Sequence, residues 1–427
     1  MLRLFRFALI ATVTAVMASP AGAEGTTELI SASMTGRAVG AGSPSVDATG
    51  RHVLFFAASS EVVAGDTKGH PDVFMRDRET GRTTRVSVGP GGRELNGTAW
   101  ARWITSNARY VLFTSNARNV VATGPDDFTY QAYIRDLQAG INECVSVSNT
   151  GAWARSYGDA LEASESGRRV LFTSRGDNLV PGATGNVQRL YLRDRLTRQT
   201  DTVGPAAAET LNGHLSGNGR FVTFSTRYSI TKPDPRPGDE VYVKDLATGR
   251  YTIVSRSSSG IRANAPAVPY DISRDGRYVV FGSAAANLVP NDTNGQYDLF
   301  LRDRQTSKTE RISVAGNEAQ ANGYSVTGKV SDDGRFVAFW SAATNLVTKP
   351  TTVGHVYLRD RLLGTTQRVD VSTTGVPGNG PVQFNEVAIS ADGHVVAFTS
   401  LADNLAPGDA NTAYDVYVHE KQVAGGL

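Results

Sequence analysis

The sequence is poor in cysteine, in long apolar segments and in net charge, and each shortage excludes a class of protein. Cys144 is the only cysteine among 427 residues, so no intrachain disulfide can hold the fold together. A chain of this length can bury a core of its own and does not need one. Because Cys144 lies in the alternating stretch NECVSV, which is typical of a strand, we interpret it as a buried apolar residue.

No apolar run is long enough to cross a bilayer. The N-terminus instead has the pattern of an export signal, in which two arginines precede an uncharged apolar run and residues 21–23 (AGA) form a cleavage motif. The sequence therefore predicts a signal peptide over residues 1–23. We expect residues 24–427 to form one domain that is periplasmic or secreted and not inserted in the membrane.

The small positive charge of the chain comes from this leader. The whole sequence has 43 Lys and Arg against 41 Asp and Glu, and the leader holds two of the arginines and no acid. The remaining residues are therefore balanced in charge. A nucleic-acid partner is not expected, because such proteins carry a basic excess concentrated on one face.

One phrase recurs through the chain. SDDGRFVAFW at 331–340 matches SRDGRYVVFG at 273–282 and SADGHVVAFT at 390–399. The turn residue of this phrase, which is glycine in all copies but one, occurs seven times at intervals of 52 to 59 residues, at Gly50, Ala108, Gly167, Gly219, Gly276, Gly334 and Gly393. Repeats of this period indicate an array of similar structural units.

The fifth copy shows that each unit is a meander of four short strands. An apolar segment ending at residue 273, then 278–283, 297–303 and 309–314, alternate with turns rich in Gly, Asp and Asn. One such sheet leaves both of its faces uncovered, and neighbouring sheets supply the cover. The sequence therefore predicts an all-β fold, a seven-bladed β-propeller of four-stranded antiparallel blades.

Closure of the ring can also be predicted. The seventh copy has only three strands, because the chain ends soon after residues 414–420 (YDVYVHE). The segment TTELIS at 26–31 aligns with the fourth strand of other copies, such as KTERIS at 308–313. We expect this N-terminal strand to complete the last blade, which removes exposed sheet edges.

The copies DGRYVVF, NLVPNDTNG, YDLFLRD and TERISV resemble the WD-like repeats of TolB-type β-propellers of bacterial envelopes. The resemblance covers residues 24–427 and implies an exported propeller. TolB itself has six blades and an additional N-terminal α/β domain, whereas this chain has seven copies. The resemblance concerns the fold, and a fold of this kind carries many unrelated activities.

A basic–acidic pair closes the third strand of six copies. The pairs are Arg76–Asp77, Arg135–Asp136, Arg193–Asp194, Lys244–Asp245, Arg302–Asp303 and Arg359–Asp360. A catalytic group is needed once, so a residue that recurs with the blades is structural. We expect each aspartate to cap the following turn and each arginine to pair with a carboxylate.

The long loops differ between copies, and two of them contain oxygen ligands at calcium-like spacing. Copy five has Asp292, Asn294 and Asp298 in DTNGQYD, and copy seven has Asp409, Asn411 and Asp415 in DANTAYD. Such spacing resembles the first half of a calcium loop, although Asp–x–Asn–Gly is also a common turn sequence. Calcium is therefore a candidate ion, and an ordinary turn is the alternative.

Three tryptophans do not recur with the blades. Trp100 and Trp103 lie near the start of the second copy's first strand, and Trp153 lies in a blade connection. We expect them on the variable loop face, either as anchors for a ligand or as packing between unequal blades.

Sequence motifs of catalysis are missing. The chain has no G-x-S-x-G and no H-E-x-x-H, and its six histidines are scattered. The sequence therefore favours a non-enzymatic binding scaffold that presents its variable loops to an envelope or extracellular protein or peptide. The alternative is a propeller that binds or cleaves carbohydrate, with calcium as a candidate aid.

Overall fold

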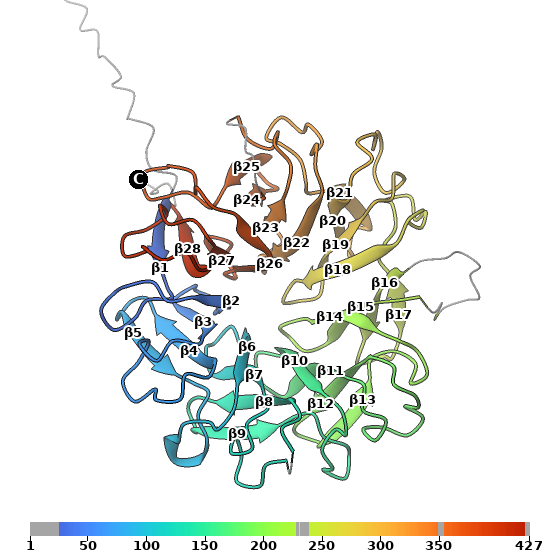
Figure 1. Ribbon diagram of the computed structural model, residues 1–427. Coiled ribbons are helices and arrows are strands. Elements are labelled where there is room, and N and C mark those ends of the chain that lie inside the picture. The colour runs from blue at the N-terminus through green and yellow to red at the C-terminus, as the bar shows by residue number, and fades with distance from the viewer. Residues whose placement is uncertain (1–24, 126, 228–229, 231–238, 349–353, 423–427) are drawn as a thin grey trace, which may run out of the picture.

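The computed structural model describes residues 25–125, 127–227, 230, 239–348 and 354–422. Twenty-eight strands form seven four-stranded antiparallel sheets around a centre, and the 3-10 turn η1 (Pro90–Gly92) is the only helical element of these residues. The predicted seven-bladed β-propeller is confirmed (Figure 1). The predicted signal peptide, residues 1–23, lies outside the described residues.

Six blades are uninterrupted meanders, numbered here in chain order and given from the innermost strand outward. They are blade one, β2 (Ala41–Val46), β3 (His52–Ala57), β4 (Asp72–Asp77) and β5 (Arg82–Arg85); blade two, β6 (Ala99–Ile104), β7 (Tyr110–Ser115), β8 (Gln131–Asp136) and β9 (Ile141–Cys144); blade three, β10 (Gly158–Ala163), β11 (Arg169–Ser174), β12 (Arg189–Asp194) and β13 (Gln199–Thr202); blade four, β14 (Leu211–Leu215), β15 (Phe221–Thr226), β16 (Glu240–Asp245) and β17 (Tyr251–Ile253); blade five, β18 (Ala267–Ile272), β19 (Tyr278–Ser283), β20 (Asp298–Asp303) and β21 (Lys308–Arg311); and blade six, β22 (Ser325–Val330), β23 (Phe336–Ser341), β24 (His355–Asp360) and β25 (Thr365–Arg368).

Blade seven combines the first described strand with the last three. It contains β26 (Val382–Ile389), β27 (Val395–Ser400) and β28 (Asp415–Lys421), and its outer strand is β1 (Gly25–Leu29). β1 pairs antiparallel with β28, with Gly25 opposite Lys421 and Leu29 opposite Tyr417. The predicted closure is confirmed, and Figure 1 shows the blue β1 beside the red strands β27 and β28.

The core lies between neighbouring blades. The phenylalanine that recurs on each second strand is fully buried in all seven copies, at Phe55, Phe113, Phe172, Phe224, Phe281, Phe339 and Phe398. Each packs on an aromatic ring of the third strand, as Phe281 does on Phe300 with ring centroids 5.7 Å apart. Apolar side chains of adjacent blades share one cluster, so each blade supplies the cover that its neighbour needs.

The meander gives the ring two unlike faces. Turns between the first and second strands, and between the third and fourth, lie on what we call the short-turn face. Loops between the second and third strands, and the connections between blades, lie on the opposite, long-loop face. The strand order within each sheet fixes this division.

Aromatic residues and arginines join the blades on the short-turn face. Gly276 has φ of +77°, and a Cβ atom there would overlap the ring of Phe221 in blade four. Arg220 and Arg304 lie over that same ring, 5.0 and 4.4 Å from its centroid. Glycine is therefore required at this position for two reasons. Its backbone adopts a left-handed conformation, and the ring of Phe221 leaves no space for a Cβ atom.

The basic–acidic pairs are structural, and the predicted pairing of their arginines with carboxylates is found at Arg359, which contacts Glu318, but not at Arg302. Asp303 Oδ1 accepts hydrogen bonds from the backbone N–H groups of Gln305 and Thr306, which confirms the predicted turn cap. Arg302 donates to Thr309 Oγ1 and to the carbonyl of Ser257, both at 2.9 Å, and not to a carboxylate. The fixed geometry of the guanidinium suits such joints between blade and connection.

Candidate functional site

The innermost strands of the seven blades surround a central channel, which contains a cavity of about 290 Å³. Residues of all seven innermost strands line it, together with the turns that follow them on the short-turn face. Ligand sites commonly form in concave spaces of this size. The channel is therefore the candidate functional site.

A β-bulge in every innermost strand turns side chains toward the channel. The register breaks between the following pairs: Gly42/Ser45, Ala101/Trp103, Ala160/Glu162, Leu211/His214, Pro269/Asp271, Val326/Lys329 and Val382/Val387. Because a bulge inserts extra residues into one strand, it changes which side chains face inward. The simple alternation of a strand therefore does not decide what lines the channel.

One position after the bulge differs in chemistry from blade to blade. It pairs with the residue just before the recurrent phenylalanine and is occupied by Ser45, Trp103, Glu162, His214, Asp271, Lys329 and Ala388. We call these seven residues the channel ring. Blades three to six supply ionisable groups, while blades one, two and seven supply small or apolar ones. Residues that hold the blades together recur from blade to blade, whereas this charged half of the ring does not recur, which makes it a candidate for a functional role.

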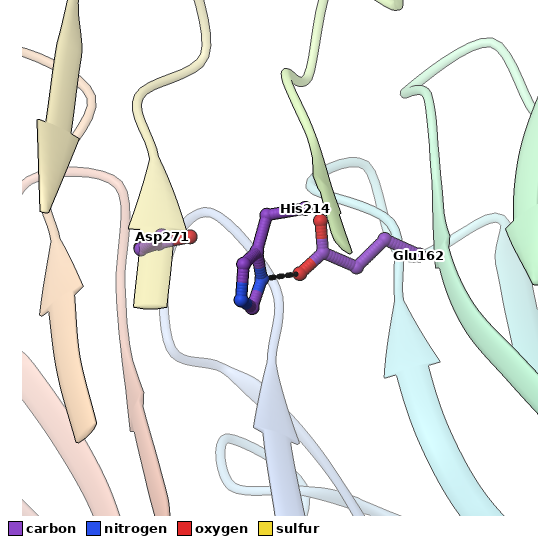
Figure 2. A group of neighbouring side chains, drawn as sticks. All are labelled: Glu162, His214 and Asp271. Carbon is purple, nitrogen blue, oxygen red and sulfur yellow. Dashed lines mark hydrogen bonds and ion pairs between the residues drawn. The ribbon is translucent and has the colours of Figure 1, made fainter. Parts of the chain in front are cut away.

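His214 lies between two carboxylates (Figure 2). Its Nδ1 is 2.7 Å from Glu162 Oε1, and the other oxygen of Glu162 accepts the backbone N–H of Leu215, also at 2.7 Å. Burial raises the pKa of Glu162, but the attraction and hydrogen bond of His214, together with Lys329 and the N–H of Leu215, outweigh burial, and the pKa is lowered overall. Glu162 is therefore held as a carboxylate against the imidazole.

Asp271 and Lys329 complete the charged half. Oδ2 of Asp271 accepts the backbone N–H of Val330 at 2.9 Å, and its Oδ1 is 3.9 Å from Lys329 Nζ. Burial raises the pKa of Asp271 despite attraction from Lys329. Lys329 Nζ also donates to the carbonyl of Tyr270 at 3.3 Å. The ammonium group is therefore held beside the acids and not within hydrogen-bond distance of Asp271.

Hydrogen bonds and an ion pair narrow the short-turn end of the channel. The turns are linked through their backbones, as where Ala391 donates to Ala48 and Asp332 donates to Ala391. Arg274 of blade five reaches across to Glu165 of blade three, with Nη2 donating to Oε2 at 2.7 Å. Burial raises the pKa of Asp332 to about 6. These contacts connect the turns of several blades around the short-turn end of the channel.

The long bulge of β26 lies at the other end, beside an aromatic patch. Its Phe384 carbonyl accepts a hydrogen bond from Thr327 of blade six. Trp340 lies between Tyr324 and Phe384, with ring centroids 5.2 and 6.4 Å away. Tyr324 is 49% and Phe384 50% exposed, whereas Trp340 is buried. We call these three residues the rim patch.

The three tryptophans predicted as ligand anchors occupy separate environments. Trp103 belongs to the channel ring and lines the cavity. Trp100 packs edge-on against Phe56 at 4.7 Å, and Trp153 packs against Tyr133 at 6.3 Å. All three are partly buried, and no ring contact joins them to one another within the described residues. Their role as anchors stays a prediction.

The calcium candidate of blade five already contains a side-chain cation. Arg311 is 3.2 Å from Asp292 and 3.5 Å from Asp298, while Asn294 donates to Asp298 at 2.8 Å. Blade one has the same arrangement, in which Arg85 lies 3.4 Å from Asp66. A guanidinium among these oxygens supplies the positive charge that an ion would bring.

The candidate of blade seven differs at one position. Leu29 occupies the place of Arg311, since each is paired with the central aromatic residue of the third strand. Asp415 is fully buried, accepts hydrogen bonds from Ser31 at 2.8 Å and Asn411 at 2.9 Å, and has its pKa raised to about 6 by burial. Asp409 accepts a hydrogen bond from Tyr417. Calcium binding at either loop stays a prediction.

The charged half of the channel ring was not among the residues that the sequence predicted. His214 was counted only as one of six scattered histidines, and Glu162, Asp271 and Lys329 were not singled out. An alignment of the copies on the recurrent phenylalanine would have placed all four in one column. The signal in the sequence was that the residue type at this position changes from blade to blade, although the position is structurally equivalent in every blade.

Comparisons with known proteins support the fold and no particular activity. No family model matches the chain, and no curated protein matches it. Similar solved structures include the β-propeller domain of the Trilobed protease from Pyrococcus furiosus, with a TM-score of 0.54 and 10% identity over 90% of this chain and 93% of that one. An oligogalacturonate lyase from Vibrio parahaemolyticus has a TM-score of 0.53 and 10% identity over 93% and 97% of the two chains.

TolB from Acinetobacter baumannii is also among the similar structures, with a TM-score of 0.42 and 12% identity over 82% of this chain and 76% of that one. The protease domain is described as having an open velcro topology, whereas β1 closes the ring here. Among the described residues, no helix has the length and apolar character needed to cross a membrane. At these identities, the likenesses show a shared β-propeller fold.

Proposed function

We propose that the protein is an exported binding scaffold that holds a protein or peptide partner on its long-loop face, over the mouth of the central channel. The rim patch carries this proposal. Tyr324 and Phe384 are half exposed and flank Trp340 beside the channel. Aromatic side chains of this kind contribute much of the binding energy at protein interfaces, because they bury a large area with few rotatable bonds.

The two faces of the ring differ in the way this function requires. The short-turn face is occupied by structural contacts that recur from blade to blade, such as the pairing of Arg277 with Asp303 at 2.7 Å. The long-loop face carries the segments that differ between blades. Variable loops on a rigid framework are where binding residues gather, and the rim patch belongs to this variable set.

A second candidate is the binding of a carbohydrate, and the channel ring favours it. Trp103 lies in the same cavity as the carboxylates of Glu162 and Asp271. Sugars stack on aromatic rings and donate hydrogen bonds to carboxylates. A cavity of about 290 Å³ accommodates one sugar unit. This candidate places the ligand inside the channel, whereas the first places it across the rim.

Photocrosslinking in the producing cell tests the proposal. A photoreactive phenylalanine analogue replaces Tyr324 or Phe384 on the rim. Control positions are Leu196 and Leu362 in third-to-fourth-strand turns of the short-turn face, which are 73% and 74% exposed. We expect one predominant protein adduct from the rim positions and none from the controls. Equal adducts at all four positions, or none at the rim, would contradict docking there.

A glycan-binding assay on the purified chain distinguishes the second candidate. Binding that is lost in Trp103→Ala and kept in Tyr324→Ala would place a sugar in the channel. Binding of no glycan, together with rim-specific adducts, would leave the protein or peptide partner as the function.

A further inference from the structure

We propose that Glu162, His214 and Asp271 form a binding site for a divalent transition-metal ion, such as Zn²⁺ or Mn²⁺, inside the central channel. This inference goes beyond the proposed function, since it concerns the channel wall and requires no docked partner. It stands or falls on metal binding by the chain alone.

The three side chains come from consecutive blades and converge on one point. One potential ligand atom from each lies within 4.8 Å of the other two. Ligand atoms around one tetrahedral ion with bonds of about 2.1 Å are about 3.4 Å apart. Shifts of about 1 Å in side chains that border a cavity are therefore sufficient to bring a nitrogen of His214 and an oxygen of Asp271 to this spacing.

The hydrogen bonds of the site leave suitable atoms facing the channel. Glu162 Oε1 binds Nδ1 of His214 at 2.7 Å, which leaves the lone pair of Nε2 available. A carboxylate behind a histidine fixes the imidazole in this tautomer in many metal sites. Asp271 is 8% exposed, and its Oδ1 accepts no hydrogen bond from the described residues. His214 Nε2 and Asp271 Oδ1 are therefore the direct ligands, and Glu162 positions His214.

The donor set selects the class of ion. An imidazole nitrogen beside carboxylate oxygens suits first-row transition metals, while calcium and magnesium prefer sites made of oxygen alone. Water in the channel would complete the coordination. The remaining positions of the ion would thus face the cavity, where an incoming ligand can reach them.

Lys329 supplies the side-chain cation nearest to the proposed site. Its Nζ lies 3.9 Å from Asp271 Oδ1 and offsets the negative charge that burial makes costly. A metal ion would compete with this ammonium group, which can swing away on its flexible stem because its hydrogen bond to the Tyr270 carbonyl is long, at 3.3 Å. Removal of Lys329 is therefore expected to strengthen metal binding, an effect that a merely structural cluster would not produce.

The arrangement is distinctive among the histidines. His52, His355 and His394 each contact one aspartate of their own blade, Asp47, Asp370 and Asp392 respectively. His214 is the one described histidine placed between carboxylates of two other blades and facing the cavity. The second acidic group that could hold an ion, near Asp66, already contains Arg85.

Titration with Co²⁺ tests the site, because cobalt bound by nitrogen and oxygen absorbs visible light. The full chain is used after a purification tag has been removed and after treatment with EDTA. We expect one Co²⁺ per chain, at least about tenfold weaker binding in Asp271→Asn and His214→Gln, and tighter binding in Lys329→Met. Asp332→Asn, a channel carboxylate outside the cluster, and His394→Asn, a surface histidine beside an aspartate, are matched controls.

Each result decides the matter. Absence of a cobalt spectrum in the wild-type chain, spectra in Asp271→Asn and His214→Gln equal to that of the wild type, or unchanged or weaker binding in Lys329→Met would overturn the site. Asp271 Oδ2 also holds the backbone of Val330, so thermal unfolding in EDTA checks that the variants are folded. If Asp271→Asn is unfolded, Lys329→Met still tests the proposal, because it keeps every ligand and predicts a gain in affinity.

Discussion

Substitution of Gly276 by alanine tests whether the turn glycine of the repeated phrase stabilises the packing of one blade against the next. Gly276 has φ of +77°, and its added Cβ atom would overlap the ring of Phe221 in the preceding blade. Gly260 has φ of +85° and nothing within 4 Å of the corresponding position. The two glycines share a backbone conformation and differ in what surrounds them. Gly260→Ala is therefore a matched control for the backbone alone.

The expected losses follow from these surroundings. Alanine in a left-handed conformation costs about 1–2 kcal/mol at either position. At Gly276 the ring of Phe221 must also move, which costs about 1–3 kcal/mol as overpacking. That movement disturbs the contacts of Arg220 and Arg304 with the ring, each worth about 0.5–1 kcal/mol. Gly276→Ala should therefore lose roughly 3–7 kcal/mol and Gly260→Ala roughly 1–2 kcal/mol.

Urea unfolding followed by far-ultraviolet circular dichroism measures both free energies. Equal losses in the two variants would refute the reasoning, since they would show that the packing of the ring on the glycine contributes nothing. Blade two contains a natural counterpart, because Ala108 occupies the turn position there with φ of 53°. The equivalent neighbour in blade one is His52, which is held by Asp47 at 2.7 Å, and not a large apolar ring.

Three further predictions concern buried or ion-binding groups. Leu29→Arg should abolish any thermal stabilisation by calcium, because an arginine there would occupy the space between Asp409 and Asp415 as Arg311 does between its own aspartates in blade five. In the wild type, calcium at about 100 times its Kd would raise the free energy of unfolding by about 2.7 kcal/mol. The same melting temperature in EDTA and in millimolar calcium would exclude calcium binding by the wild type. Burial raises the pKa of Asp415 to about 6, so the folded chain keeps a proton that the unfolded chain releases near pH 4. This group therefore contributes about 3 kcal/mol to stability below pH 4, and the contribution is lost as the pH rises to 6. Asp415→Asn should reduce the fall in unfolding free energy between pH 4 and 6, measured in EDTA, and the same dependence of that free energy on pH in both proteins would contradict the raised pKa. Burial raises the pKa of the Cys144 thiol to about 12, so iodoacetamide at pH 8 should modify it slowly in the native protein and rapidly in urea, and equal rates would contradict burial.

The fold could be predicted from the sequence because its determinants are local and repeated. The turn glycine, the phenylalanine that follows it and the spacing of the copies define a blade without any knowledge of distant contacts. Closure was predictable for the same reason, since residues 26–31 repeat the pattern of a fourth strand. The observed β21 ends at Arg311, three residues before the predicted boundary at 314, because Val314 instead pairs with Gln320 in an isolated bridge.

The channel could not be predicted in the same way, because a bulge breaks the alternation on which strand interpretation depends. Glu162 faces the channel only because the register shifts between it and Ala160. The calcium candidates show a related limit. Asp292 and Asp298 suggest an ion when their loop is considered alone, but Arg311 reaches them from the adjacent strand through the pairing of β20 with β21. In both cases the relevant neighbour lies on another strand and is revealed only by the pairing of the strands.

Closure of the ring by β1 also determines when folding can finish. Gly25–Leu29 must pair with Asp415–Lys421, so the last sheet forms only when nearly the whole chain is available. Until then β28 has an open edge, and an open edge can pair with another chain. Pairing of such distant segments is slow, because closing the long loop between them costs conformational entropy before any stabilising contact forms. The chain is thus most vulnerable to aggregation and proteolysis just before β1 pairs with β28. A chaperone that covers the edge of β28 in that interval would protect the protein without contacting the surface of its folded state.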